Sequence, residues 1–378
     1  MNVVVVGGGI IGCSVAARLA LAQVKVTVLE RSIPGAEASS AAAGILGAQS
    51  EADGPGAFYD LCERSRDLYP AFVDELEALV GFDVGYRPTG VLHVTTTQEG
   101  EAALQRAVTW QRARGLDAEL VDAHAARALE PALASTLRAA AVFPRDASID
   151  NRQLMRALIM TAAKRGVSFR TGYVRGLVSQ GGRCTGVDLD GATLEADAVV
   201  VAAGSWTGLV QGLALPPQGV RPARGQMVML RTRLPLLQRV VVTDGGYLVP
   251  RADGRLLAGS TMELVGFEKH VTAEGLRRIL AMALGACPAL AEAPVEEHWA
   301  GLRPLTEDRL PILGQGPLEG LFLASGHFRN GILLAPVTGE LISQLVLGER
   351  TSLDLTPFRF DRPALKDTSC SPTRSASL

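Results

Sequence analysis

The chain has 378 residues, enough for about two domains, and its 47% hydrophobic and 20% charged residues predict folded cores rather than disorder. Lysine and arginine number 37 against 39 acidic residues, which gives a net charge of -2. This balance lacks the basic footprint of a nucleic-acid-binding protein and the polybasic segment of a membrane-surface protein.

Five cysteines are scattered along the chain, with no CxxC pair and no metal-ligand spacing. They indicate a reducing compartment without a disulfide framework or a zinc site. Gly7 interrupts the apolar run at the N-terminus, and no other apolar stretch approaches the ~20 residues that a membrane span needs. We therefore expect a soluble, cytoplasmic α/β protein with no metal, nucleic-acid or membrane partner.

The first thirty residues predict a strand-helix-strand unit. Residues 2–6 form an unalternating β-branched run, which is typical of a central parallel strand buried on both faces. Residues 14–22 are rich in Ala and Leu and predict a helix. Residues 25–30 are a second β-branched strand that ends in an acid.

The later elements suggest a parallel sheet at both ends of the chain and an antiparallel sheet between them. Helices are predicted at residues 58–80, 98–114, just before 131, 150–165, 273–284 and 339–347, and strands at 90–95, 167–170, 174–179, 184–188, 198–202 and 320–324. Residues 220–258 alternate strand patterns with Pro and Gly turns. We assign 1–81, 142–215 and 301–362 to a discontinuous nucleotide domain, 82–141 and 216–300 to a substrate domain, and 363–378 to a flexible tail.

A dinucleotide site is predicted at the first turn. Gly7, Gly9 and Gly12 form G-x-G-x-x-G between a strand and a helix, where they allow a tight turn, close approach to pyrophosphate and close helix-sheet packing. Glu30 follows at the end of the second strand, where a carboxylate can accept from ribose hydroxyls. Glu30 argues against NADP, but this pattern alone leaves FAD and NAD open.

Five segments resemble the D-amino-acid oxidase superfamily of flavoproteins: the glycine turn, SAAAG at 40–44, AVVVAAGSW at 198–206, and the C-terminal pair HWAGLRP at 298–304 and GHFRNGI at 326–332. The C-terminal pair is most similar to the glycine oxidases of the thiamine pathway. The resemblance covers the chain to about residue 361. It implies a two-domain α/β fold in which the nucleotide domain is an FAD-binding domain with a parallel sheet and the substrate domain is built on an antiparallel sheet.

The resemblance also implies a reaction and an assembly. An FAD-dependent amine oxidase of this kind converts a small amino acid to an imine, reduces molecular oxygen to hydrogen peroxide, and releases glyoxylate and ammonia when the substrate is glycine. A homotetramer is expected. Related enzymes that oxidise methylated amines tether flavin through a late cysteine, and here no cysteine lies between Cys287 and Cys370. We therefore expect non-covalent FAD.

The flavin contacts implied by the resemblance fall in three regions. The early region comprises the glycine turn with Ile10 and Ile11, then Glu30 and Arg31, then Ser39, Ser40, Ala43, Gly44 and Ile45. Val174 would meet adenine through its backbone. His327, Phe328, Arg329, Asn330, Gly331, Ile332 and Leu333 would wrap the isoalloxazine, and we expect a helix to begin near Gly331.

Four residues are implied at the substrate. Arg303 would clamp the carboxylate, Tyr247 would assist through its hydroxyl, and Arg329 would lie near substrate and flavin, while Met262 would line a small pocket with Ile45. Other interpretations stay open: a surface arginine in a turn for Arg303, a solvated strand tyrosine for Tyr247, a structural ion pair for Arg329, and plain packing for Met262.

Three other functions stay open at this level. On the same scaffold the chain could be a D-amino-acid or sarcosine oxidase, or a dehydrogenase that passes electrons to a carrier. The glycine turn alone also fits an NAD-dependent dehydrogenase, and a non-catalytic flavin-binding protein would keep the cofactor site without the substrate residues.

Overall fold

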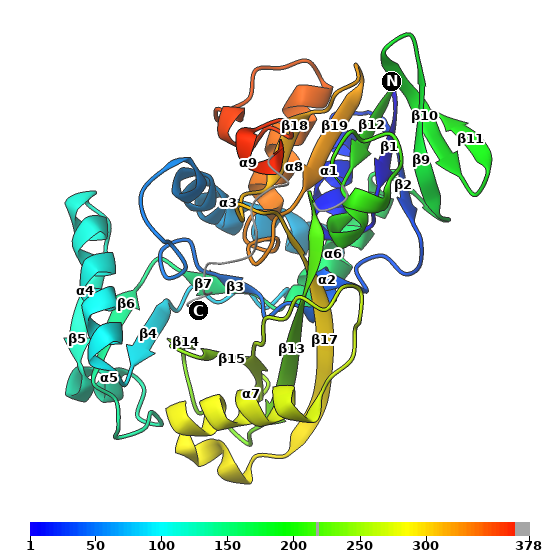
Figure 1. Cartoon of the computed structure of the whole chain (residues 1–378). Helices are drawn as coiled ribbons and strands as arrows, with labels where there is room; N and C mark the ends of the chain where they lie inside the picture. The colour runs from blue at the N-terminus through cyan, green and yellow to red at the C-terminus, as the bar shows by residue number, and fades with distance from the viewer. Residues whose placement is uncertain (217–218, 367–378) are drawn as a thin grey trace.

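The computed structural model describes residues 1–216 and 219–366, and these contain two large sheets (Figure 1). A six-stranded sheet has the order β18-β19-β12-β1-β2-β8, and an eight-stranded sheet has the order β17-β13-β16-β15-β14-β4-β6-β5. A three-stranded sheet, β11-β10-β9, and a two-stranded sheet, β3-β7, complete the set. The expected α/β fold is confirmed: the six-stranded sheet is mainly parallel, and the eight-stranded sheet is mainly antiparallel, with β14 and β4 as a parallel pair inside it.

The six-stranded sheet contains the parallel core of the fold. Its strands are β18 (Ile312–Gln315), β19 (Leu321–Ser325), β12 (Ala198–Val201), β1 (Asn2–Val6), β2 (Lys25–Glu30) and β8 (Ser168–Thr171). β1 pairs in parallel with both β12 and β2, and only β18, at the edge, runs antiparallel to its neighbour. β1 is therefore central, as its β-branched run predicts.

Both faces of β1 are covered, which explains its lack of alternation. Val3 and Val5 belong to one core with α1 (Ile10–Leu21), α3 (Ala57–Val80), α6 (Asn151–Lys164) and α8 (Ala335–Val346). Val4 and Val6 belong to another core with the three-stranded sheet of β9 (Val174–Gln180), β10 (Arg183–Leu189) and β11 (Ala192–Glu195). Successive side chains still point to opposite faces, but neither face meets water.

The eight-stranded sheet also has two different faces. Its strands are β17 (Val295–Leu305), β13 (Arg221–Arg231), β16 (Arg255–Gly259), β15 (Gly246–Pro250), β14 (Val240–Thr243), β4 (Val91–Thr95), β6 (Ala139–Phe143) and β5 (Glu119–Asp122). Val228 and Leu230 pack towards α7 (Ala273–Ala286). Met227 and Met229 point the other way and pack with Ala43 and Ile45, so this second face carries the candidate site.

Several boundaries differ from the sequence prediction. α1 begins at Ile10 rather than residue 14, directly after the glycine turn, and α8 begins at Ala335 rather than residue 339. Residues 35–47, here called the small-residue loop because most are Ala, Ser or Gly, contain a short helix, α2 (Ala38–Ala41), and the strand β3 (Ile45–Leu46), which pairs with β7 (Ala147–Ser148). The remaining elements are α4 (Gln98–Ala113), α5 (Ala123–Leu129), η1 (Gly204–Leu209), η2 (Pro288–Glu292), η3 (Thr356–Phe358) and α9 (Pro363–Lys366).

The domain limits assigned from the sequence stay a proposal. β17 continues from Val295 to Leu305 and so crosses the limit placed at residue 300. Residues 363–366, assigned to the tail, form α9 with Leu365 buried, whereas 367–378 lie outside the described residues. Within the described part of the chain, no helix is both long and apolar enough to cross a membrane.

Candidate active site

A cavity of about 590 Å³ lies where the two large sheets meet, and residues of both sheets line it. This volume is in the usual range for a small-molecule site. Gly7 and Glu30 come from the six-stranded sheet and its first turn, Val174 comes from the three-stranded sheet, and Tyr247 and Arg303 come from the eight-stranded sheet. Sequence segments assigned to cofactor and to substrate thus share one cavity.

The glycine turn has no space for side chains. Gly7 has a φ of +107°, and a Cβ there would lie 2.4 Å from the carbonyl oxygen of Ala202, at the end of β12. A Cβ on Gly12 would lie 1.9 Å from the carbonyl oxygen of Gly7. The start of α1 is therefore pressed against its own turn, as a dinucleotide-binding turn requires. The close packing at this turn therefore suits a bound pyrophosphate group.

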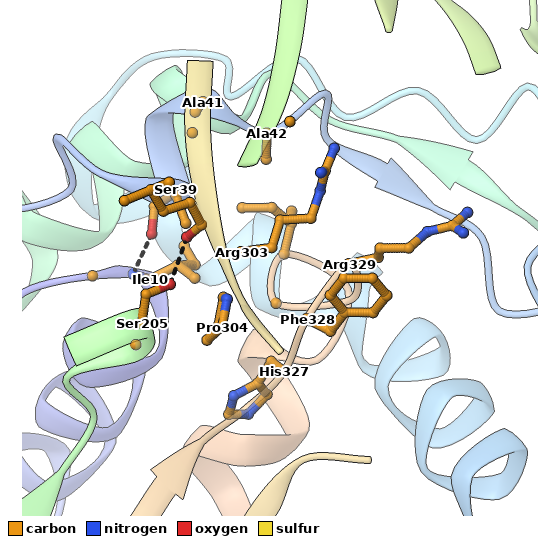
Figure 2. Close-up of a pocket in the computed structure, with 18 of the residues that line it drawn as sticks. Ile10, Ser39, Ala41, Ala42, Ser205, Arg303, Pro304, His327, Phe328 and Arg329 are labelled. Atoms are coloured by element: carbon orange, nitrogen blue, oxygen red, sulfur yellow. Dashed lines mark hydrogen bonds between the residues drawn. The ribbon is translucent and has the colours of Figure 1, made fainter. Parts of the chain in front are cut away.

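Glu30 and Ser39 hold the turn from the cavity side. The Glu30 carboxylate accepts hydrogen bonds from the backbone N–H groups of Gly8 (2.9 Å) and Ser32 (3.0 Å). Ser39 Oγ accepts from the N–H of Ile10 at 2.9 Å, which is one of the contacts drawn in Figure 2. Glu30 thus lies beside the first turn of α1, where a ribose would be expected.

Arg31 is fixed by an aromatic neighbour that the sequence analysis did not assign. Its guanidinium lies 3.7 Å from the ring centre of Trp206, and it pairs with Glu37 at 2.7 Å. Trp206 in turn meets Phe267, with ring centres 5.5 Å apart. Trp206 ends the segment at 198–206 that carries the family resemblance, but its contact with Arg31 is visible only in the fold.

The small-residue loop is clamped on the cavity wall. Arg251 Nη2 donates to the carbonyl of Ala43 at 2.7 Å, and Asn151 Nδ2 donates to that of Ser39 at 2.8 Å. Gly44 has a φ of +77°, and a Cβ there would lie 2.0 Å from the carbonyl oxygen of Ile149. The loop can therefore offer backbone to a flat ligand without side chains in between.

Arg303 lies on β17, not in a turn, so the interpretation as a turn arginine is wrong. Pro304 is accommodated because β17 is the edge strand of the sheet, where a missing N–H breaks no ladder. Arg303 Nη2 donates to Ser260 Oγ at 2.6 Å, and Nη1 donates to the carbonyl of Thr261 at 3.2 Å. The guanidinium lies over Gly225 of β13, where a Cβ would come within 2.1 Å of Nη1.

Tyr247 and Met262 also line the cavity. The Tyr247 hydroxyl has the Sδ of Met227 at 3.3 Å, a weak acceptor, rather than a carboxylate or carbonyl. Tyr247 is half-buried on β15, so its hydroxyl is held beside apolar side chains at the cavity wall. Ile45 packs in the same cluster.

Neighbouring side chains of the segment from His327 to Arg329 point in different directions (Figure 2). His327 points away from Arg303 and Arg329; it is buried, and its Nε2 lies 3.1 Å from Thr338 Oγ1 on α8. Burial lowers the pKa of His327 to about 3, so the imidazole is neutral. Phe328 has a φ of +45°, and its N–H donates to the carbonyl of Pro304 at 3.0 Å.

The helix expected to begin near Gly331 begins at Ala335 instead, because Pro336 favours the first turn and residues 331–334 form a separate turn. Leu334 N–H donates to the carbonyl of Asn330 at 2.8 Å, so this turn leads directly into α8. Gly331 and Ile332 line the cavity.

Arg329 forms an ion pair inside the site. Its Nη2 lies 3.5 Å from Glu51 Oε2, and both residues line the cavity. The Glu51 carboxylate, with smaller contributions from Tyr247 and Asp53, holds the pKa of Arg329 above its usual range. Arg329 thus forms the expected ion pair and also lines the cavity, while its place near the substrate stays a prediction.

Nineteen of the residues assigned from the sequence line the cavity, and four do not: Gly12, Ser40, Asn330 and Leu333. Gly12 contributes by packing, as described above. No sequence motif marks Gly225, Ser260 and Thr261 around Arg303, or Glu51 and His93 near Arg329, and none marks Gln49, which also lines the cavity. A glycine inside a strand is a usual sign of close approach, and this signal could have revealed Gly225.

Within residues 1–216 and 219–366, no His, Cys, Asp and Glu side chains gather in a metal-binding group.

Comparison with known proteins agrees with this geometry. A family model described as FAD dependent oxidoreductase (DAO) matches residues 2–345. The bifunctional protein ThiO/ThiG of Synechocystis sp. is 40% identical over 360 residues, covering 93% of this chain and 52% of that protein. The glycine oxidase of Geobacillus kaustophilus is 38% identical over 368 residues, covering 96% of this chain and 97% of that protein. The chain thus spans about half the length of the first and nearly all of the second.

Solved structures give the same result. The crystal structure of glycine oxidase from Geobacillus kaustophilus matches with a TM-score of 0.91 and 38% identity, over 95% of this chain and 98% of that one. The crystal structure of iminodiacetate oxidase from Chelativorans sp. BNC1 matches with a TM-score of 0.85 and 29% identity, over 94% and 98% of the two chains.

Proposed function

The chain belongs to the DAO family of FAD-dependent oxidoreductases, and from this premise we propose that it is a glycine oxidase, with sarcosine and small D-amino acids as further substrates. Overall, glycine, oxygen and water become glyoxylate, ammonia and hydrogen peroxide. When bound, FAD supplies the two-electron acceptor for the amine and returns those electrons to oxygen. The protein supplies orientation.

Arg303 carries the proposal, because its environment suits a substrate carboxylate. Its two recorded partners are a hydroxyl and a carbonyl, which leave its positive charge uncompensated. Each terminal guanidinium nitrogen carries two hydrogens, so Nη1 and Nη2 each retain one N–H for a bidentate contact with a carboxylate.

Tyr247 and the small pocket complete the positioning. The weak sulfur partner leaves the Tyr247 hydroxyl able to donate to the same carboxylate. Met262 and Ile45 line the cavity and limit the space for a substrate side chain, which favours a substrate with no side chain or a short one. With its carboxylate fixed at Arg303, glycine presents its Cα hydrogen in one orientation, and such positioning can supply much of the rate.

His327 takes no part in proton transfer in this scheme. It is buried, neutral and bonded to Thr338, so it braces the segment that continues to Phe328 and Arg329. The amine must be neutral to release its lone pair, and we propose that it loses its proton to solvent rather than to a dedicated base.

Arg303→Ala tests the proposal. The KM for glycine should rise by about a hundredfold or more, since a charge-assisted contact at the cavity wall is lost, while FAD stays bound. Arg303→Lys is the matched control, because it keeps the positive charge but loses the bidentate geometry of the guanidinium. Its KM for glycine should lie between those of the wild type and Arg303→Ala. Peroxide formation with glycine, sarcosine and D-alanine gives the readout. An unchanged KM in Arg303→Ala would contradict the assignment of Arg303 as the carboxylate anchor.

The cellular role and assembly are further parts of the proposal. We propose a cytoplasmic homotetramer that supplies thiamine thiazole synthesis, as the resemblance to ThiO proteins suggests. Light scattering on the purified protein tests the tetramer. Peroxide release in the same assay as above distinguishes an oxidase from a dehydrogenase on this scaffold.

A further inference from the structure

Arg303 and Arg329 both line the candidate active site, but of these two only Arg329 is paired with an acid. Arg303 contacts a hydroxyl and a carbonyl, and no carboxylate of the described residues forms an ion pair with it. Arg329 lies 3.5 Å from the Glu51 carboxylate. The Arg329 side chain is 45% exposed although it lines the cavity, so this pair lies where the cavity meets solvent.

Glu51 is held in place by a buried polar network just before it in the chain. The Asp146 carboxylate is fully buried and accepts from the N–H groups of Gln49 (3.1 Å) and Ser50 (2.7 Å). Arg66 Nη1 donates to Gln49 Oε1 at 2.9 Å and lies 3.7 Å from Asp146. The backbone that carries Glu51 is therefore fixed, unlike an ordinary surface loop.

The local packing also reserves space for the Glu51 side chain. Its N–H donates to the carbonyl of Gly47 at 3.3 Å, so the backbone turns tightly here. A Cβ on Gly47 would lie 3.1 Å from Glu51 Cγ. The Glu51 side chain is only 15% exposed, and Asp53 adds a second negative charge nearby. The Glu51 carboxylate is thus a built part of the cavity wall.

We propose that Glu51 determines substrate specificity: it occupies Arg329, so the cavity accepts amines with one carboxylate at Arg303 and disfavours amines with a second carboxylate. A second carboxylate that approached Arg329 would have to displace Glu51 and would be repelled by it. This inference deepens the proposed function and rests on it. Like-charge exclusion is a usual way to obtain specificity.

Sarcosine and iminodiacetate test it, because they differ only by one carboxylate. In Glu51→Gln, the amide keeps the shape of the side chain but frees Arg329. The ratio of kcat/KM for iminodiacetate to kcat/KM for sarcosine should rise about tenfold or more, the size expected of one charge-assisted contact. Glu349→Gln is the matched control, since it removes the charge of an exposed glutamate that does not line the cavity. Its ratio should match the wild type.

A double variant identifies the group responsible. If freed Arg329 receives the second carboxylate, Glu51→Gln with Arg329→Gln should lose the gain in that ratio. A ratio that does not rise in Glu51→Gln, or a gain that survives without Arg329, would overturn the inference. A role for Glu51 in holding the amine would change both substrates in the same proportion, and so would also overturn it.

A binding measurement separates this inference from the proposed function. Acetate and malonate differ by one carboxylate and need no turnover, and their binding can be followed by the flavin absorption of the holoprotein. The ratio of the affinity for malonate to the affinity for acetate should be about tenfold higher in Glu51→Gln than in the wild type. If sarcosine and glycine are not oxidised, the proposed function fails, while the malonate result still decides the role of Glu51.

Discussion

The position of Arg303 depends on a residue of the neighbouring strand. β13 and β17 pair along their whole lengths, with Gly225 opposite Gly301 and Ala223 opposite Arg303. The guanidinium lies over Gly225, where any side chain would occupy its place. A strand glycine costs local stability, and here it leaves the space in which the guanidinium lies.

Gly225→Ala should therefore move Arg303 without unfolding the protein. The new Cβ would stand 2.3 Å from Nη2 and 2.4 Å from Cζ, the far end of a flexible side chain. We expect the KM for glycine to rise roughly tenfold, one charge-assisted contact being weakened, with little change in Tm. The control is Gly285→Ala on α7, where nothing lies within 4 Å of the new Cβ. It should leave KM unchanged and stabilise by about 0.5–1 kcal/mol. An unchanged KM in Gly225→Ala would show that Arg303 does not depend on this space.

At the scale of elements, the connection from β19 to α8 combines a buried histidine with the cavity wall. His327 contacts Thr338 on α8, and the next two residues turn towards the cavity. A protonated imidazole would have neither water nor an acidic partner among its recorded contacts. Protonation should therefore loosen this connection.

His327 makes stability depend on pH. Burial lowers its pKa from 6.5 to about 3 in the folded protein. Between these values the unfolded chain binds a proton that the folded chain does not, so the contribution is complete above 6.5 and is lost as the pH falls towards 3. The free energy of unfolding should fall by up to about 1.4 kcal/mol per pH unit in this window. His327→Asn cannot titrate, so its urea-unfolding stability should decline less steeply. Equal slopes for the two proteins would contradict this assignment.

Elements with a strong local signal were predictable from the sequence, and those fixed by partners were not. The strands β1 and β2, the helix α3 with its stop at Gly81, and the Asp150 cap of α6 agree with their patterns. β6, with the sequence AAAVF, was missed because its alanines favour helix, yet burial between β4 and β5 makes it a strand. The start of α8 was misplaced by four residues because the turn at 331–334 has no separate sequence signal.

The same division applies to the candidate site. The glycine turn, Glu30 and Arg303 were identified because motifs mark them. Glu51, Ser260 and Thr261 were not, because they enter through long-range contacts: Glu51 meets Arg329 across most of the chain, and Ser260 and Thr261 meet Arg303 from the loop after β16. Pairwise contacts of this kind become visible only once the sheets are assembled.

At the scale of the whole molecule, the cavity lies between a mainly parallel and a mainly antiparallel sheet, and no described cysteine lines it. Cys13, Cys62, Cys184 and Cys287 are buried and free, and burial raises the pKa of each thiol. A buried thiol of raised pKa is a poor nucleophile, so covalent attachment of flavin to these residues is disfavoured.

Acid precipitation should therefore separate protein from cofactor. The precipitate should be colourless and the supernatant yellow, because only non-covalent contacts hold FAD. Adding FAD back to protein stripped under milder conditions should restore stability, by about 2.7 kcal/mol at a hundredfold excess over Kd. Yellow colour that stays with the precipitate would mean a covalent bond.

An anaerobic titration with glycine tests the central claim most directly, because it requires cofactor, substrate binding and electron transfer together. We expect the visible flavin absorption to bleach as glycine is added, and to return with release of hydrogen peroxide when air is admitted. Sarcosine should act likewise, and Arg303→Ala should need far more glycine for the same effect. A flavin spectrum that glycine, sarcosine and D-alanine all leave unchanged would contradict the account.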